Sequence, residues 1–270
     1  MKTRILTAAV LVPLLLIVVL LAPTEVAAII FGVMMSIAAY ELLYRTGLVR
    51  RRRLVLYSAV AAFAVAMWSC FGAMQAYLLL GLLVYSLLLF SEMMMDHVKV
   101  HFEEICACFF AGFVVPYLLC AVVRILVLVI GKYVVLVPFV IACLSDAGAY
   151  FVGINFGRHK LAPVVSPNKT IEGMLGGIAT AIVGMLIYSL VLDLAFDFTV
   201  NYGLAILYGI FGAIAGVFGD LCFSIIKRQT GIKDYGNLSP GHGGILDRFD
   251  SMMTVAPLVE ALLIIAPFAV

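Results

Sequence analysis

The stretch GLAILYGIFGAIAGVFGDLCFSII, residues 203–226, decides the fold class. A hydrocarbon core about 30 Å thick needs about 20 apolar residues of helix, and this stretch is long enough to cross it. It is continuously apolar, whereas a strand of a membrane β-barrel alternates between apolar and polar residues. Asp220 is its single charged residue. The stretch therefore predicts a membrane-spanning helix that carries one carboxylate.

The composition indicates that much of the rest of the chain also lies in the membrane. Of its 270 residues, 65% are hydrophobic and 12% are charged, against about 45–50% and about 25% in soluble proteins. The mean hydropathy is +1.20. These values exclude a disordered chain and a secreted disulfide scaffold. The six cysteines form no CxxC pair and are interpreted as small buried hydrophobes. We expect an all-α, polytopic integral membrane protein.

Apolar runs long enough to span a membrane occur about nine times. The first follows Lys2 and Arg4, as in a signal peptide, but it is longer than the apolar part of one, so a retained helix is expected. The third and fourth meet at 71–73, which leaves a re-entrant hairpin as an alternative. The predicted spans are 5–22, 25–43, 54–71, 74–90, 105–123, 134–154, 174–192, 203–226 and 252–270.

The basic residues predict the orientation. With nine spans and a cytoplasmic N-terminus, all 17 lysines and arginines except Arg124 and Lys132 fall on the inner side. This asymmetry is typical of cytoplasmic loops. The basic run 50–53 is interpreted as a topology anchor near anionic lipid, with a phosphate site as the alternative.

Two predicted spans carry a carboxylate well inside them, Asp146 and Asp220. A buried carboxylate is costly unless it is paired, bound to a metal or placed in a wet cavity. The alternative is a polar group bonded to a neighbouring helix. Along the second of these spans runs a stripe of small residues, which predicts close helix packing and could also serve a homodimer. The stripe consists of Ala205, Gly209, Gly212, Gly216 and Gly219.

We predict two regions in the chain. Residues 1–130 form N-terminal transmembrane helices, and residues 131–270 form a C-terminal catalytic region. The second region holds two polar cytoplasmic loops, 155–173 and 227–251. The first loop ends at a helix N-terminus, which suits an anion, although the glycines of a P-loop are absent. The second contains the glycine-rich run 241–244, which could form a nest of backbone donors for phosphate.

The residue types in these loops indicate metal-assisted transfer of a phosphate-containing group. There is no Ser–His–Asp arrangement and no zinc ligand set. Carboxylates suit Mg²⁺, and lysines and arginines suit a polyphosphate. The membrane setting implies a lipid as one substrate and a soluble polyphosphate as the other. Two alternatives remain: a transporter or channel, and a lipid-alcohol kinase that uses CTP.

The loop SIIKRQTGIKDYGNLSPGHGGILDRFD, residues 224–250, resembles the signature of the bacterial phosphatidate cytidylyltransferases, also called CDP-diacylglycerol synthases. The stretches 145–153 and 156–173 resemble a second region of that family. Ser239 and Ile154 depart from the family pattern. The matching positions are Ser224, Lys227, Arg228, Lys233, Asp234, Gly236, Pro240, His242, Gly243, Gly244, Asp247, Arg248 and Asp250.

This resemblance implies a reaction in which CTP and phosphatidic acid give CDP-diacylglycerol and pyrophosphate, with Mg²⁺ and a monovalent cation such as K⁺. It also implies an inner (plasma) membrane protein whose active site faces the cytoplasm, with membrane lipid but no nucleic acid among its partners. The implied catalytic residues are Asp220, Asp247, Lys227, Lys233 and Arg248. The implied metal ligands are Asp220, Asp247, Asp146 and Asp250. The implied nucleotide-binding residues are Lys169, Glu172, Arg228, His242, Gly243 and Gly244.

Overall fold

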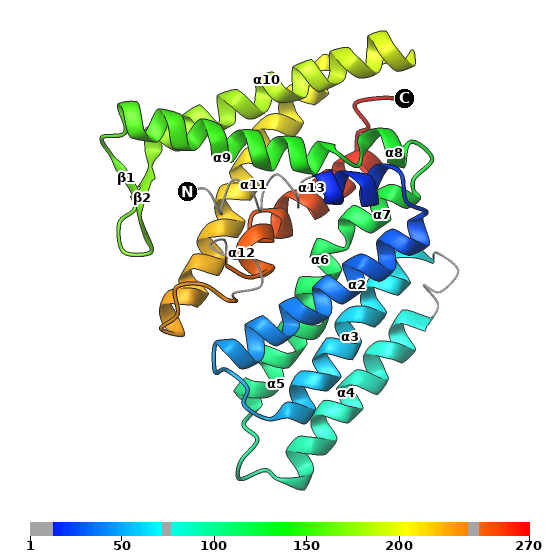
Figure 1. Cartoon of the computed structure of the whole chain (residues 1–270), viewed down its shortest axis with the longest axis vertical. Helices are drawn as coiled ribbons and strands as arrows, with labels where there is room; N and C mark the ends of the chain where they lie inside the picture. Colours follow the sequence, from blue (N-terminus) through cyan, green and yellow to red (C-terminus); the bar gives the residue numbers. More distant parts are fainter. Residues whose placement is uncertain (1–12, 72–76, 237–242) are drawn as a thin grey trace. The chain divides into compact units, whose positions relative to one another are not determined.

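The computed structural model describes residues 13–71, 77–236 and 243–270, and most of them are helical (Figure 1). The chain forms two compact units. The first, called unit 1, comprises Met1–Val127 and Gln229–Phe249. The second, called unit 2, comprises Leu128–Arg228 and Asp250–Val270. The predicted functional division at residue 130 stays a prediction.

Unit 1 is a bundle of long apolar helices, and residues 13–20 are also helical. Its last long segment contains Pro116, which cannot donate the N–H that a continuous α-helix needs, and the segment breaks at Cys120. A π-helical turn precedes this proline. The elements are α2 (Thr24–Tyr40), the π-helical turn η1 (Glu41–Arg45), α3 (Arg52–Cys70), α4 (Leu78–Met95), α5 (Phe102–Phe109), the π-helical turn η3 (Phe110–Val114), α6 (Val115–Leu119), α7 (Ala121–Val127) and the short α12 (Leu246–Phe249).

Several polar side chains in unit 1 form hydrogen bonds between helices. The hydroxyls of Ser58 on α3 and Tyr85 on α4 lie 2.9 Å apart, and Tyr85 donates to the carbonyl of Cys108 on α5 at 2.7 Å. The Arg124 guanidinium donates to the Tyr117 carbonyl at 2.8 Å and lies 4.4 Å from the centre of the Tyr117 ring. Arg124, which interrupts an apolar run in the sequence, thus stays inside helix α7 with partners of its own.

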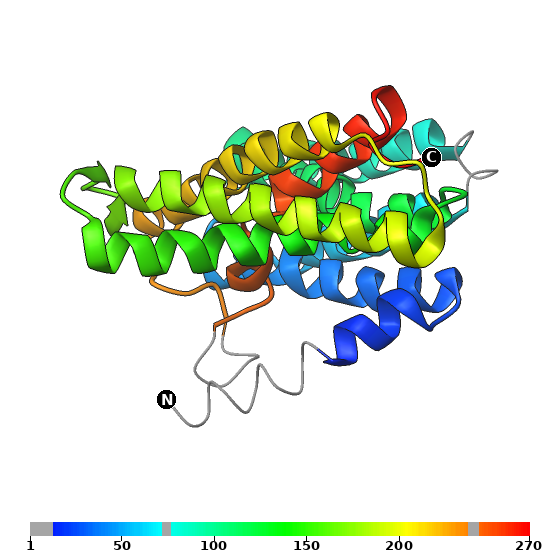
Figure 2. The ribbon, with the colours of Figure 1, turned by 90° about the horizontal axis from the view of Figure 1, so that it is seen from above.

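Unit 2 is built around two long helices that lie side by side, α9 and α10, joined at one end by a small β-hairpin (Figure 2). The two strands are antiparallel, with Lys160 opposite Thr170. The hairpin was not expected from the sequence, although the chain remains all-α in class. The elements are α8 (Gly131–Val134), α9 (Val137–Phe156), β1 (Lys160–Ala162), β2 (Ser166–Thr170), α10 (Ile171–Phe196), α11 (Tyr202–Gln229) and α13 (Met252–Ile265).

Small residues let the helices of unit 2 approach closely. Thr180 on α10 donates to the Leu144 carbonyl on α9 at 2.8 Å. A Cβ on Gly148 of α9 would overlap the Thr180 side chain, and one on Gly177 would lie 2.6 Å from the Ser145 carbonyl oxygen. The small residues near Asp146 therefore serve helix packing.

The glycine stripe of α11 is covered inside unit 2. A Cβ on Gly209 would lie 2.9 Å from the Ile182 Cα on α10, and one on Gly212 would lie 2.7 Å from Ile141 on α9. A Cβ on Gly219 would lie 2.7 Å from the Asp250 carbonyl oxygen. The close packing predicted from this stripe is confirmed. The expected homodimer stays a prediction, and it would need another surface.

Seven helical segments in the described part of the chain are long and apolar enough to cross a membrane. They match the second to the eighth predicted spans. The first predicted span lies partly outside the described residues, as does the proposed hairpin at 71–73. The ninth appears as a shorter apolar helix. The seven segments are Thr24–Arg45, Arg52–Cys70, Leu78–Met95, Phe102–Val127, Gly131–Phe156, Ile171–Phe196 and Tyr202–Gln229.

Candidate active site

The centre of the site in unit 2 is Asp220, six residues before the last predicted residue of its span. Its Oδ2 forms an ion pair with the ammonium group of Lys169 on β2. Ser224, one helical turn further along α11, donates to Oδ1 at 3.1 Å. Helical spacing puts Ser224 on the same face as Asp220, as predicted, but the tertiary fold brings in Lys169.

Two further carboxylates lie near Asp220. The exposed Asp146 on α9 interacts with the charges of Asp220 and Lys169. Asp250, which directly precedes the last helical region, is also close. Burial and the charge of Asp220 together raise the pKa of the Asp250 carboxyl to about 7, although Lys227 lowers it. Asp146, Asp220 and Asp250 thus lie in unit 2 together with the basic side chains of Lys169 and Lys227.

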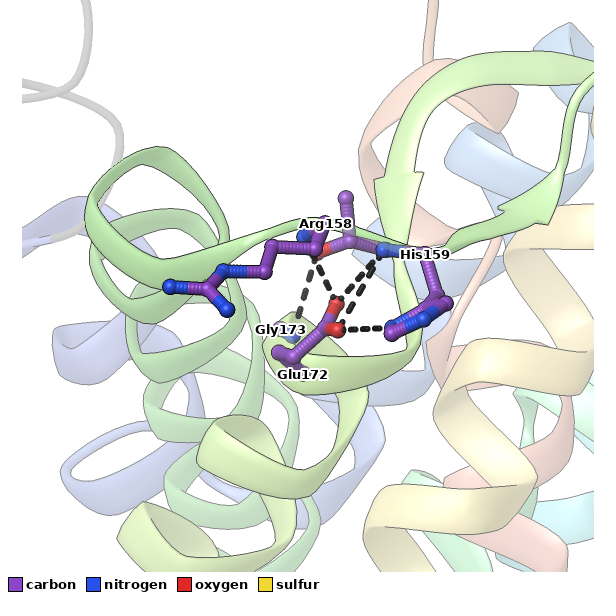
Figure 3. Close-up of polar contacts among 5 residues, drawn as sticks. Arg158, His159, Glu172 and Gly173 are labelled. Atoms are coloured by element: carbon purple, nitrogen blue, oxygen red, sulfur yellow. Dashed lines mark hydrogen bonds and ion pairs between the residues drawn. The ribbon is translucent and has the colours of Figure 1, made fainter.

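Glu172 fixes the base of the β-hairpin (Figure 3). Its carboxylate accepts hydrogen bonds from the backbone N–H groups of Arg158 and His159, each at 3.1 Å, and Oε1 lies 2.5 Å from the His159 Nδ1. The neighbouring Thr170 accepts from the Gly173 N–H at 3.1 Å and so caps α10. In this structure Glu172 holds the segment that carries Lys169, and its expected nucleotide contact stays a prediction.

The last turn of α11 reaches the same hairpin. Arg228 Nε lies 3.4 Å from the carbonyl oxygen of Val165, a residue of the turn that joins the two strands. Lys227 interacts with the Asp250 carboxyl. Both basic side chains lie about two helical turns beyond Asp220 along α11.

Unit 1 contains the predicted glycine-rich loop. Asp247 Oδ2 accepts hydrogen bonds from the N–H groups of Tyr235 and Gly244, at 2.8 and 2.9 Å. Gly243 has a φ of +83°, and a Cβ there would lie 2.6 Å from Asp247 Oδ2. Only glycine adopts this conformation at little cost. Asp247 therefore organises the loop, in addition to its expected role as a metal ligand.

The remaining predicted residues of this loop are only partly described. Lys233 and Arg248 are exposed. Gly241 and His242, the first two residues of the predicted phosphate nest, lie outside the described residues, so the nest stays a prediction.

Glu41 was not predicted as a functional residue from the sequence. This carboxylate lies in the π-helical turn that follows α2, is 3% exposed, and accepts a hydrogen bond from the Leu246 N–H at 3.1 Å. A carboxylate near the inner end of the second predicted span was the signal that could have identified it.

The predicted metal ligands are distributed over both units. Asp146, Asp220 and Asp250 belong to unit 2, whereas Asp247 belongs to unit 1. Among the described residues, no group of three or more His, Cys, Asp or Glu side chains is arranged to hold a metal ion. A carboxylate pair remains sufficient for Mg²⁺, which commonly completes its shell with water and substrate phosphate oxygens.

The helices and the charged site define a multi-pass membrane protein with carboxylates and cations gathered at the ends of apolar helices. The chain belongs to the cytidylyltransferase family, whose profile matches residues 2–266. The family membership inferred from the loop signatures is therefore confirmed.

Curated relatives support the same family. The chain is 48% identical over 134 residues to the phosphatidate cytidylyltransferase of Staphylococcus haemolyticus (strain JCSC1435). It is 45% identical over the same length to that of Staphylococcus aureus (strain COL). Each match covers 50% of this chain and 50% of the relative. The chain thus aligns with about half the length of the curated relatives it matches.

Proposed function

We propose that this protein transfers a cytidylyl group from CTP to phosphatidic acid and forms CDP-diacylglycerol and pyrophosphate. The family match and the names of the staphylococcal relatives support this activity. The structural observation that carries it is the ion pair between Asp220 and Lys169, with Asp146 and Asp250 beside it. Such a mixed cluster suits a polyphosphate and its counter-cation.

The reaction needs positioning more than a protein nucleophile. A phosphate oxygen of phosphatidic acid attacks the α-phosphorus of CTP. The bond from that phosphorus to the bridging oxygen of the β-phosphate breaks, and pyrophosphate leaves with the electron pair. The second pKa of a phosphate monoester is about 6, so the attacking oxygen is ionised at neutral pH without a general base.

The residues present fit Mg²⁺, because Asp146, Asp220 and Asp250 place carboxylate oxygens near one another in unit 2, and Mg²⁺ prefers oxygen ligands. Asp220, with Asp146 or Asp250, would hold the ion, and the family signature implies Asp247 as a further metal ligand. The ion would supply neutralisation of phosphate charge. A monovalent cation such as K⁺ is part of the same proposal.

The basic side chains would bind and orient the phosphates. Lys169, Lys227 and Arg228 are gathered around the end of α11. Lys233 and Arg248, with the backbone of 242–244, would contact the nucleotide from the glycine-rich loop. Charged hydrogen bonds to phosphate are roughly twice as strong as neutral ones.

The proposed location is the inner (plasma) membrane, with the active site facing the cytoplasm. The distribution of basic residues supports this orientation. Phosphatidic acid would enter from the bilayer and CTP from the cytoplasm. A homodimer is also proposed, and no nucleic acid is expected among the partners.

The test is to incubate the purified protein in mixed micelles with α-³²P-labelled CTP, phosphatidic acid and Mg²⁺. We expect label in CDP-diacylglycerol and stoichiometric release of pyrophosphate. A lipid-alcohol kinase would instead transfer the γ-phosphate to a hydroxyl lipid. A transporter would give no labelled lipid whether CTP is labelled at the α- or at the γ-phosphate. Kinase activity, or the absence of any labelled lipid, would contradict the proposal.

A further inference from the structure

Glu41 connects two parts of unit 1 that are far apart in the sequence. It begins the π-helical turn that follows α2, and its Oε2 accepts the N–H of Leu246 at 3.1 Å. The side chain is 3% exposed. Its carboxylate also interacts with the backbone of Ile245 and with the charges of Asp247 and Arg45. A buried carboxylate is retained at low cost only where such donors satisfy it.

Two glycines leave the space that this carboxylate occupies. A Cβ on Gly244 would lie 2.5 Å from the Glu41 Cδ, and a Cβ on Gly236 would lie 2.9 Å from the same atom. Neither glycine has a positive φ, unlike Gly243. The requirement for glycine at 236 and 244 therefore comes from the Glu41 side chain and not from the local backbone conformation.

The same loop segment holds Asp247. Gly244 donates its N–H to Asp247 Oδ2, and the adjacent N–H groups of the segment turn toward Glu41. The two carboxylates thus accept hydrogen bonds from neighbouring N–H groups of the short segment 244–246. Removal of either carboxylate would leave an N–H group of this segment without its acceptor, and the other carboxylate binds the same segment.

We propose that Glu41 is a positioning residue that fixes the glycine-rich loop and thereby places Asp247 for nucleotide binding. The inference about nucleotide binding rests on the proposed function, whereas the anchoring of the loop does not. Glu41 itself does not contact a substrate in this proposal. It acts through the backbone of 244–246.

The anchoring is tested by hydrogen–deuterium exchange of peptides that cover 243–249, measured on the full chain in detergent. Glu41→Gln keeps the size of the side chain and one acceptor oxygen, whereas Glu41→Ala removes both. We expect exchange at these positions to be faster in Glu41→Ala and intermediate in Glu41→Gln. Glu25→Gln, the same change at an exposed position of α2, is the matched control. Unchanged exchange in Glu41→Ala would overturn the proposal.

A double-mutant cycle tests the steric part. In the wild-type background Gly244→Ala forces a methyl group against the Glu41 carboxylate, so it should lower the Tm. In the Glu41→Ala background the same substitution has room, and it should change the Tm much less. Coupling is expected only for residues in contact. If Gly244→Ala lowers the Tm equally in both backgrounds, Glu41 does not determine the need for glycine.

Kinetics separate positioning from simple destabilisation. Glu41→Gln should raise the apparent KM for CTP by about fivefold or more, while the KM for phosphatidic acid changes by less than about twofold. A variant that merely contains less folded enzyme would lower Vmax with both KM values unchanged, and that result would overturn the positioning role. If the wild-type protein forms no CDP-lipid, the proposed function fails, but the exchange and Tm measurements still decide whether Glu41 anchors the loop.

Discussion

Asp220 is not an isolated carboxylate in an apolar helix, because two side chains bind its oxygens. Lys169 balances its charge, and Ser224 donates to its second oxygen. A purely structural aspartate would be satisfied by this pairing alone. The additional carboxylates Asp146 and Asp250 are not needed for that pairing, and they support the proposal that the cluster binds a cation and phosphate.

The change Asp220→Asn keeps the shape of the side chain and removes its charge. We expect kcat/KM to fall by about 10²–10³-fold, comparable to the loss of about 3–4 kcal/mol of transition-state stabilisation. Cytidylyl transfer at several Mg²⁺ concentrations is the measurement. Asp197→Asn, at an exposed position with a φ of 56° that asparagine tolerates, is the control. Near-normal activity of Asp220→Asn would leave this residue with a structural role only.

Asp250 gives the site a defined pH dependence. Its folded-state pKa is raised to about 7, against about 3.9 in an unfolded chain. The folded state therefore binds this proton more tightly. The resulting stabilisation is complete below pH about 4 and is lost as the pH rises through about 7.

In EDTA, the Tm should therefore fall between pH 5 and pH 8, and Asp250→Asn should reduce this fall because asparagine does not ionise. Thermal unfolding in detergent at both pH values measures it. A Tm difference between the two pH values that is the same in wild type and variant would show that Asp250 is not the group that titrates.

At the scale of elements, the β-hairpin between α9 and α10 is the feature that assembles the site in unit 2. The hairpin carries Lys169 to Asp220, and Glu172 fixes its base through two backbone N–H groups and the His159 ring (Figure 3). The short strands alone would not hold this geometry, because an isolated two-stranded hairpin is marginally stable.

Glu172→Ala should therefore loosen the hairpin and lower kcat/KM by about tenfold, since one misplaced binding group costs on the order of 1–2 kcal/mol. Limited trypsin digestion should also cut faster after Lys160. Asp193→Ala, which removes another carboxylate of the same helix and its bond to Tyr202, is the matched control. Unaltered proteolysis with reduced activity would indicate instead that Glu172 contacts the nucleotide directly.

At the scale of the whole molecule, the helices fix the site relative to the bilayer. Seven described segments are long enough to cross a membrane, and nearly all basic residues fall on one side of the predicted topology. The charge asymmetry predicts that both polar loops face the cytoplasm, the compartment from which the proposed substrate CTP would come.

Single cysteines introduced into a cysteine-free variant test this orientation. Residues 50, 158 and 233 should react with a membrane-impermeant maleimide only from the cytoplasmic side, and residue 132 only from the outer side. Inverted membrane vesicles and intact cells supply the two directions. Labelling of residue 233 from outside alone would contradict both the topology and the access of CTP.

The sequence by itself determined the class of fold and much of the candidate site. Hydropathy is a local property, so the long apolar runs predicted the second to eighth spans, and helical periodicity predicted that Ser224 shares a face with Asp220. The glycine stripe predicted close packing for the same reason. The loop signatures identified the family because they concern residues close together in the chain.

Only the tertiary structure decided which distant residues meet. The pairing of Lys169 with Asp220 depends on a hairpin whose short strands show no periodicity in the sequence. The bond from the Leu246 N–H to Glu41 joins residues 205 positions apart. Glu172 contacts the backbone of Arg158 and His159, which the sequence did not predict. Such contacts arise from packing and from the need to satisfy buried polar groups, and neither requirement leaves a local pattern in the sequence.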